Sequence, residues 1–500
     1  MKYLVGIICL LPMVAFAQLK MAPFFTNNMI LQRDQPIVFY GTGIPGKSVL
    51  AEFAKMQKEV IVAIDSSWQI TFPPQASSAQ PQQCIILSVT EKIVLNNILL
   101  GDIWVCIGQS NMEWPVMREM HYSTEKASSN QSLIRLYNPT YAGKNIFNTT
   151  FNDSVVQRLT PKKFYAGKWE QCDSNSIKTL TAVGYYFAKQ LVKSVDIPIG
   201  IIHLSIGGAP LETFIRKEAL LANAGFSAKV SGNWLTNPTL PEWIKERGLQ
   251  NIGNASDVPG DELGKNHAFK PGFAYQSGLA PLTQFPVKGF LCYQGESNAQ
   301  EMDRVREYAD LFTLLVKDYR KQWHNNEMPF YFVQLSSIDT VKYKGQLWPE
   351  FRDEQRKVVQ QLSNTGMAVS SDVGFKNDVH PTDKKTIGER LARWAFQQTY
   401  HKSVIPSGPL PINAEYKKGK VIIRFQYAGK KLVTANNAIL HGFSVEGGVM
   451  RLASIRKKTV ILTVTETPTY ITYGWKSFSD GNLLNDAGLP ASTFRIKVKE

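Results

Sequence analysis

Residues that build metal centres and disulfide frameworks are scarce in this sequence. Only five cysteines and seven histidines occur among the 500 residues. No histidine and cysteine cluster has the spacing of zinc ligands, so we expect neither a metal ion nor another cofactor. A chain of this length also needs no dense set of disulfides. Cys106 and Cys292 lie in apolar runs, where free cysteine acts as a small hydrophobe, whereas pairing of Cys84 with Cys172 stays open.

Apolar runs long enough to cross a membrane are also absent. The run Leu4–Val14 is shorter than the ~20 residues that a membrane-spanning helix requires. It follows Lys2 and precedes Ala15-Phe16-Ala17, which is the pattern of a secretory signal peptide over residues 1–17. We therefore expect an exported protein, periplasmic or extracellular, without a membrane span.

Acidic residues are outnumbered by basic ones. Lysine and arginine total 56 residues against 41 aspartates and glutamates, for a net charge of +15. The basic residues are dispersed and lack the interleaved aromatics of a nucleic-acid site, so no nucleic-acid partner is expected. A positive field favours anionic small substrates or glycans, although a solvated basic surface without function is the more common explanation.

The hydrophobic pattern changes twice along the chain. Residues 18–98 contain alternating segments between Gly and Pro turns, which predicts a small β-sandwich. Residues 99–401 alternate short apolar runs with helical periods, which predicts a parallel sheet covered by helices on both faces. An excursion over about 213–272 interrupts this rhythm and is typical of a lid or binding loop. Strand patterns return over residues 402–500. The fold class is therefore α/β, flanked by two β domains.

The central region contains nine segments with a clear period. Short apolar runs indicate buried strands, and apolar residues spaced three and four apart indicate helices. The predicted strands are 102–107, 198–204, 287–293, 328–335 and 366–371, and the predicted helices are 180–195, 302–323, 350–362 and 383–398.

A serine follows the first of these predicted strands. The apolar run ends at Gly108, and Gln109, Ser110 and Asn111 come next. In open α/β sheets the carboxyl ends of the strands are where ligands bind. Ser110 is therefore either an activated hydroxyl or a helix cap, since serine and asparagine also favour the cap position.

Two later segments favour the activated hydroxyl. Tyr293–Asn298 forms a polar, glycine-containing loop after an apolar run, and Asp378 and His380 precede the last predicted helix. A serine nucleophile, a histidine that takes and returns its proton, and amides that stabilise an oxyanion are the components of acyl transfer.

These motifs together resemble the sialate O-acetylesterase family of the SGNH-hydrolase superfamily. The resemblance begins at Asn28–Arg33 and continues through Gly108–Met112, Gly207–Glu212, Tyr293–Asn298 and Asp378–Pro381. Each motif alone is weak, but five in the same order are specific, and they cover essentially the whole mature chain. The resemblance implies a three-layer α/β/α domain between β domains, and removal of O-acetyl groups from sialic acids.

The resemblance also implies a role for individual residues. Ser110 corresponds to the nucleophile and His380 to the general base that later acts as an acid. The backbone N–H groups of Ser110 and Gly208 correspond to oxyanion donors, and a side-chain amide completes the hole. Gln294 is the first candidate for that amide because it directly follows the strand, and Asn298 is the second.

The acid of the triad departs from the superfamily pattern. The usual acid stands three residues before the histidine, where this chain has Asn377, and Asp378 lies only two residues before His380. Residues i and i+2 of an extended segment point to the same side, so the carboxylate of Asp378 can reach the imidazole. A backbone carbonyl can equally hold the imidazole, which would leave a Ser-His dyad.

Three functions fit these residues. The first is a serine esterase that deacetylates sialic acids, and the second is the same mechanism acting on acetylated xylan or another acetylated glycan. The positive net charge favours the anionic sugar, whose carboxylate an arginine can bind. The third is a catalytically silent glycan-binding protein, which the complete set of Ser, Gly, Gln and His argues against.

Overall fold

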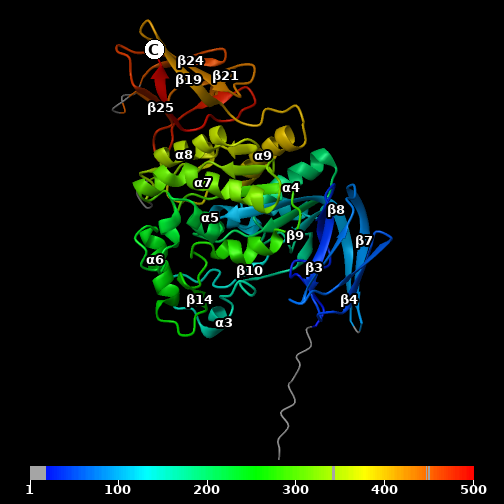
Figure 1. Ribbon diagram of the computed structural model, residues 1–500. Helices are drawn as coiled ribbons and strands as arrows, with labels where there is room; N and C mark the ends of the chain where they lie inside the picture. Colours follow the sequence, from blue (N-terminus) through cyan, green and yellow to red (C-terminus); the bar gives the residue numbers. More distant parts are fainter. Residues whose placement is uncertain (1–17, 90, 340–343, 446–447, 449–450, 500) are drawn as a thin grey trace, which may run out of the picture.

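Three bodies follow one another along the chain, an N-terminal β body, a central α/β body and a C-terminal β body (Figure 1). The computed structural model describes residues 18–89, 91–339, 344–445, 448 and 451–499. The signal peptide expected over residues 1–17 lies outside the described residues. No helix of the described ranges is both long and apolar enough to cross a membrane.

Alternating burial builds the N-terminal body. In the strand Ser48–Phe53, every second side chain is buried, as a sheet with one apolar face requires. Phe39, Phe53 and Phe72 meet between the two sheets with ring centroids 5.5–6.1 Å apart. The strands are β1 (Lys20–Met21), β2 (Ile30–Gln32), β3 (Ile37–Thr42), β4 (Ser48–Phe53), β5 (Met56–Ile61), β6 (Ser67–Phe72) and β7 (Ser78–Ser88).

A single long strand, β8 (Lys92–Gly108), connects this body to the next. Its first half pairs with β7 and β2, and its second half pairs with β13 (Ile199–His203) and β16 (Gly289–Tyr293). The boundary expected between residues 98 and 99 therefore falls inside a continuous strand. The turn that carries Ser110 stands at the end of a strand that belongs to both bodies.

The central sheet has the strand order β12-β9-β13-β8-β16-β17-β18. The five predicted strands are present as β8, β13, β16, β17 (Phe330–Val333) and β18 (Thr365–Ala368), and all are parallel. Two strands escaped the sequence analysis, β12 (Trp169–Cys172) at the edge of the sheet and β9 (Gln131–Tyr137) next to it. Because β12 runs antiparallel to β9, the expectation of a parallel sheet is wrong at this edge.

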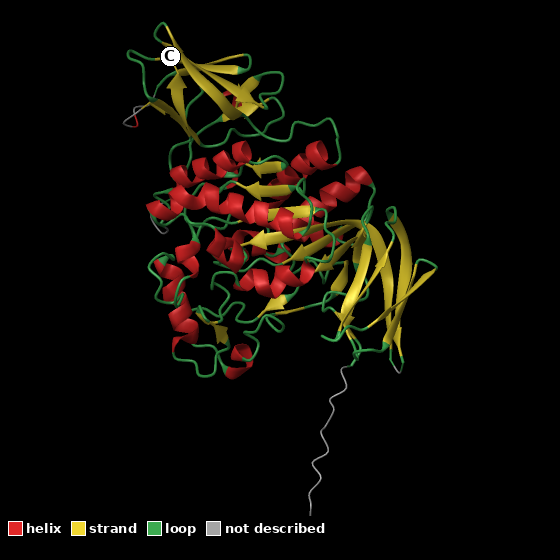
Figure 2. Ribbon diagram, viewed as in Figure 1, coloured by secondary structure: helices red, strands yellow, loops and turns green. Residues whose placement is uncertain are grey.

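Helices cover both faces of the sheet (Figure 2). Trp104 of β8 contacts Phe187 of α4 (Ala182–Val195), which packs with α9 (Lys384–Trp394) on one face. Phe290 of β16 contacts Tyr319 of α7 (Met302–Gln322), which packs with α8 (Trp348–Gln361) on the other face. Neighbouring strands thus offer aromatic side chains to opposite layers, and each of the four predicted helices lies within a few residues of its expected range.

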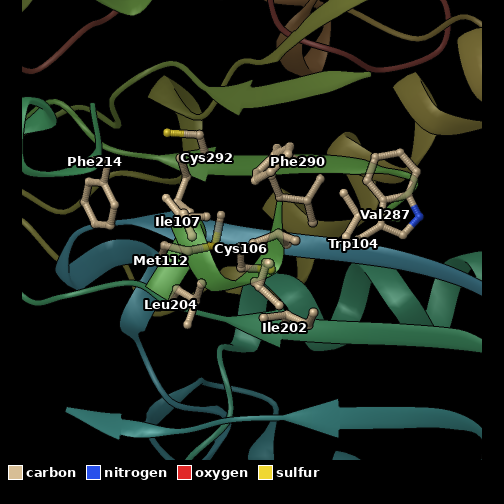
Figure 3. Packing of buried hydrophobic residues seen from close by; sticks show 14 of the residues in the cluster. Trp104, Cys106, Ile107, Met112, Ile202, Leu204, Phe214, Val287, Phe290 and Cys292 are labelled. Carbon is tan, nitrogen blue, oxygen red and sulfur yellow. The ribbon is translucent and has the colours of Figure 1, made fainter. Parts of the chain in front are cut away.

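The strands that carry the polar loops pack tightly in the middle of the sheet. Figure 3 shows Cys106 and Ile107 of β8 between Leu204, beyond β13, and Cys292 of β16. All four are buried. Among the described residues the cysteines are free, so Cys84 and Cys172 do not pair. The carboxyl ends of β8, β13 and β16 therefore meet at one place with little freedom to shift.

The excursion over 213–272 folds against the carboxyl edge of the sheet. It contains α5 (Lys217–Ala222), α6 (Glu242–Gly248) and the hairpin β14 (Gly260–Asp261) with β15 (Gly264–Lys265). Trp243 of α6 contacts Phe269, with ring centroids 5.2 Å apart. Both rings lie against Gly208, so this segment forms part of the wall around the turn that follows β13.

The C-terminal body has a core of its own, centred on Val421, Phe443 and Phe494. It is joined to the central body by Arg352 of α8, which is buried and donates to the carbonyls of Gly474 and Lys476. Its strands are β19 (Leu410–Lys417), β20 (Lys420–Gln426), β21 (Leu432–Thr434), β22 (Phe443–Val445), β23 (Ala453–Arg456), β24 (Thr459–Thr463), β25 (Tyr470–Tyr473), β26 (Leu483–Asn485) and β27 (Phe494–Lys499).

One buried carboxylate ties the N-terminal body to the end of the central body. Asp102 of β8 is fully buried and accepts hydrogen bonds from Gln32, Arg33 and Tyr400. We expect Asp102→Asn to lower the free energy of unfolding by about 3 kcal/mol, because it breaks a buried ion pair.

The matched control is Asp34→Asn. Asp34 also pairs with Arg33, at 2.8 Å, but its side chain is 59% exposed. An exposed ion pair contributes ~1 kcal/mol or less, so this change should leave stability nearly unaltered. Urea denaturation of both variants measures the difference, and equal effects would contradict the role assigned to Asp102.

Candidate active site

Gly108 sets the backbone path that presents Ser110. Its φ is +129°, a conformation that L side chains rarely adopt. A Cβ at this position would lie 2.1 Å from the carbonyl oxygen of Tyr293. The same carbonyl accepts a hydrogen bond of 3.0 Å from the backbone N–H of Gln109. The chain can therefore turn directly into the short helix α1 (Ser110–Glu113), and the serine stands at its first position.

The structure brings Ser110, His380 and Asp378 together. The Nε2 atom of His380 lies 2.8 Å from the Oγ atom of Ser110. The Nδ1 atom of His380 lies 3.0 Å from Oδ1 of Asp378. The same carboxylate oxygen accepts the backbone N–H of His380 at 2.9 Å. A spacing of two residues is thus sufficient for Asp378 to reach the imidazole, and Nδ1 faces a carboxylate in this arrangement.

The imidazole of His380 is packed on one side and open on another. Its ring stacks on Trp114 at 5.2 Å between centroids, with 19° between the planes. The side chain of His380 is 27% exposed and that of Asp378 is 58% exposed. Burial lowers the pKa of His380 below its ordinary value of 6.5, and the positive charges of Lys384 and Arg118 lower it further, while Asp378 opposes them. The ring therefore loses its proton at a lower pH than an unperturbed histidine does.

The turn after β13 places a second glycine, Gly208, beside the end of β8. The backbone N–H of Ile206 donates to the carbonyl of Gly108, which fixes this turn against the end of β8. Gly208 has a φ of +75°, and a Cβ there would lie 2.8 Å from Trp243. The turn is held further by Tyr141, whose hydroxyl accepts the N–H of Gly207 and donates to Glu113.

The two amides expected at the oxyanion site are engaged with protein groups. The Nε2 atom of Gln294 donates to Asn298 at 2.7 Å and also lies 3.3 Å from the acceptors of Gln109 and Ala209. The Nδ2 atom of Asn298 donates to Glu212 at 3.0 Å. Both residues are about 1% exposed or less. They lie in the interior beneath the turn, where they hold the loop that follows β16.

Gln109 is an amide that the sequence analysis did not single out. Its Oε1 atom accepts the backbone N–H groups of Gly295 and Ser297, at 3.4 and 3.2 Å. Within the described residues no acceptor lies within hydrogen-bonding distance of its Nε2 atom, although the residue is only 3% exposed. Its place beside Ser110 in the motif was the available signal.

Three possible metal ligands lie close together near His380. The ligand atoms of Glu119, His121 and Asp383 are within 4.8 Å of one another. Each has protein partners. Glu119 accepts hydrogen bonds from Tyr186 and from the backbone N–H of His121, and Asp383 caps α9 by accepting the N–H of Thr386. These groups complete the local structure through protein contacts, and they were not expected from sequence spacing.

Comparisons with known proteins agree on one family. Residues 270–397 match the family model described as "carbohydrate esterase, sialic acid-specific acetylesterase". Human sialate O-acetylesterase is 25% identical over 439 residues, which are 82% of this chain and 76% of the human protein. The mouse enzyme of the same name is 25% identical over 446 residues, 82% of this chain and 79% of its own length.

A solved structure agrees along nearly the whole chain. The crystal structure of a carbohydrate acetylesterase from Xanthomonas citri superposes with a TM-score of 0.78 and 25% identity, over 96% of this chain and 99% of that one. The fold, the site and these matches define a carboxylic ester hydrolase of the carbohydrate esterase class. Within that class, the chain is similar to the sialate O-acetylesterases along most of its length.

The lowered pKa of His380 predicts the pH dependence of ester hydrolysis. Only the neutral imidazole can take the proton of Ser110, so activity should rise as His380 loses its proton. Because burial and two cations hold its pKa down, kcat/KM should rise with a midpoint below 6.5. Hydrolysis of p-nitrophenyl acetate between pH 4 and 9 measures this. A midpoint above 7 would mean that Asp378 dominates the environment of the ring.

Proposed function

We propose that this protein removes O-acetyl groups from sialic acids through an acetyl-enzyme intermediate. The observation that carries the proposal is the distance of 2.8 Å between Ser110 and His380, at the strand ends of a chain that is similar to the sialate O-acetylesterases. His380 takes the proton of Ser110 while the serine oxygen attacks the acetyl carbonyl. His380 then returns the proton to the sugar oxygen, which leaves as a hydroxyl. Water repeats both steps and releases acetate.

The negative charge on the acetyl oxygen needs hydrogen-bond donors that are already in place. We assign this role to the backbone N–H groups of Ser110 and Gly208, which belong to two turns that β8 and β13 bring together. A side-chain amide is the third donor. Gln294 stays the first candidate and Asn298 the second. To donate to the oxyanion, each amide would have to break one of its present hydrogen bonds. The Nε2 atom of Gln109 needs no such exchange.

The division of the chain into domains is part of the same proposal. We assign residues 18–98 to an N-terminal β domain, 99–401 to a catalytic domain of the three-layer SGNH type, and 402–500 to a C-terminal β domain. The separate apolar core of the last region supports its assignment. Residues 1–17 act in this proposal as a signal peptide that directs the protein to the periplasm or the cell exterior.

A free cation beside the site favours an anionic sugar. Arg118 is exposed, and its guanidinium lies 5.9 Å from the centre of the Trp114 ring on which His380 stacks. Within the described residues Arg118 has no carboxylate partner at ion-pair distance. The carboxylate of a sialic acid can take this place, whereas the neutral xylose units of acetylated xylan cannot. Acetylated xylan remains the second candidate substrate.

Acetate release distinguishes the candidates. The wild-type protein should release acetate from O-acetylated sialoglycans faster than from acetylated xylan, and Ser110→Ala should release none from either. A protein that hydrolyses no ester would support the glycan-binding alternative. Removal of metal ions with a chelator should leave the rate unchanged, because no step of the proposed reaction uses a metal.

Arg118→Gln tests the charge argument. We expect it to lower kcat/KM for the sialate ester ~10-fold more than for acetylated xylan, because one charge-assisted hydrogen bond is lost at an exposed position. Rates are compared at pH 8, where His380 is neutral with or without the cation. Arg456→Gln is the matched control, since Arg456 is an exposed arginine on β23 of the C-terminal body. Equal losses on both substrates would contradict recognition of the anion.

Asp378→Asn tests the third member of the triad. In serine proteases the equivalent change costs ~10⁴-fold in kcat, where the aspartate is buried. Asp378 is 58% exposed, and solvent weakens its field, so we expect a smaller loss, on the order of 10²-fold. Single-turnover kinetics with p-nitrophenyl acetate measures it. A nearly wild-type variant, beside an inactive His380→Ala variant, would leave a Ser-His dyad.

A further inference from the structure

Asn111, the residue after Ser110, links three separate segments of the site. Its Nδ2 atom donates to Oε1 of Glu296 at 2.5 Å and to the backbone carbonyl of Val379 at 2.9 Å. Its Oδ1 atom accepts a hydrogen bond of 2.5 Å from Nζ of Lys384. The side chain of Asn111 is 1% exposed. One amide therefore joins the nucleophile turn, the loop after β16 and the segment that carries His380.

Lys384 is an unusual residue at its position. It is fully buried, and it is the first residue of α9, where the helix dipole disfavours a cation. Within the described residues it forms no ion pair within 4.0 Å. Its Nζ atom instead lies 5.6 Å from the centre of the Trp114 ring and 5.4 Å from that of Tyr293. A buried cation without a paired carboxylate is costly, so the site must gain something from its presence.

Lys384 is connected to His380 by two routes. The first passes through Asn111 to the carbonyl of Val379, which is the residue directly before His380. The second passes through Trp114, whose ring Lys384 contacts and on which the imidazole stacks. Both the backbone position and the ring plane of His380 therefore depend on groups that Lys384 contacts.

We propose that Lys384 and Asn111 are positioning residues, which hold the segment of His380 against the nucleophile turn and keep its imidazole neutral through the buried positive charge of Lys384. This inference rests on the proposed function, since it assigns the two residues to the same Ser110–His380 pair. It names the residues that align His380 with Ser110, and the charge that sets the low-pH limit of activity.

Burial and the neighbouring charges shift the pKa values of Lys384 and His380 in definite directions. Burial lowers the pKa of Lys384 to about 7, against the opposing effect of Glu296, Asp378, Asp383 and Glu119. Burial also raises the pKa of Glu296 to about 7. Lys384 is therefore mainly protonated at the pH values, below 6.5, at which His380 gains its proton. There its charge, with that of Arg118, opposes protonation of His380, while Asp378 favours it.

Lys384→Met removes the charge and keeps most of the side-chain volume. With p-nitrophenyl acetate we expect kcat to fall ~10- to 100-fold, because the His380 segment loses one of its anchors. We also expect the acidic limb of the kcat/KM profile to move to higher pH, because the cation that opposes protonation of His380 is gone. KM should change little. A merely structural lysine would not move the acidic limb.

Two further variants separate the effect of the Lys384 charge from the effect of holding the His380 segment in position. Lys384→Arg keeps the charge, so the acidic limb should stay where it is although kcat falls. Asn111→Ala removes the contact with Val379 and leaves the charge, so kcat should again fall without a shift of the limb. The double variant Lys384→Met, Asn111→Ala should lose less than the product of the single losses, because both act through one network.

Lys270→Met is the matched control. Lys270 is also a buried lysine, 1% exposed, but it bonds to Asp261 and Asn266 and does not contact the site. This variant should lose stability in a thermal melt without moving the acidic limb. A Lys384→Met enzyme with wild-type kcat and an unmoved limb would overturn the positioning roles, and so would an equal shift in Lys270→Met.

Hydrolysis of p-nitrophenyl acetate also distinguishes failure of the positioning roles from failure of the proposed function. A wild-type protein that does not hydrolyse p-nitrophenyl acetate would contradict the serine esterase itself. An active wild type that Ser110→Ala silences would leave the esterase standing, whatever the Lys384 variants do. If Lys384→Met does not fold, then Lys384→Arg and Asn111→Ala still decide the question, because multiplicative losses in their double variant would contradict a shared network.

Discussion

The close approach of β8 and β16 at Gly108 is the constraint on which the site depends. The carbonyl of Tyr293 occupies the place of a Cβ at residue 108, and it accepts the N–H of Gln109. Ser110 and the loop that begins at Gln294 therefore leave the sheet side by side. The buried side chains of β8, β13 and β16 hold these strands in register (Figure 3). Backbone geometry and core packing thus place the hydroxyl of Ser110.

The polar groups of the site divide into an open rim and a closed interior. His380 and Asp378 are partly exposed, whereas Asn111, Gln294 and Glu296 are each about 1% exposed. Buried amides with several partners rigidify a site, because losing any partner costs more than in water. The buried side chains beneath the site therefore align Ser110 and His380. The groups that can meet a sugar lie at the open side, where the 213–272 segment packs against Gly208 and Trp114 stacks on His380.

Sequence periodicity predicted the central strands and helices because their residues face apolar layers on both sides. It missed β12, at the edge of the sheet, and β9 beside it because Glu170 and Arg135 interrupt their apolar patterns. The spacing of Asp378 and His380 correctly indicated that the carboxylate can reach the imidazole. Lys384 was not predicted, since sequence cannot show that a lysine is buried. The one available signal was its position, because a lysine beginning a helix conflicts with the helix dipole, and such local conflicts concentrate at functional sites.

The flanking bodies also contribute to the alignment of the site. Asp102 ties β8 to the N-terminal body and to Tyr400, so the second half of the strand that ends at Gly108 is anchored. On the other side, the backbone N–H of Ile338 donates to the carbonyl of Ser477, and Lys376 lies over the ring of Phe478. Lys376 is two residues from Asp378. The C-terminal body therefore supports the segment that carries Asp378 and His380, and the geometry of this pair depends on all three bodies.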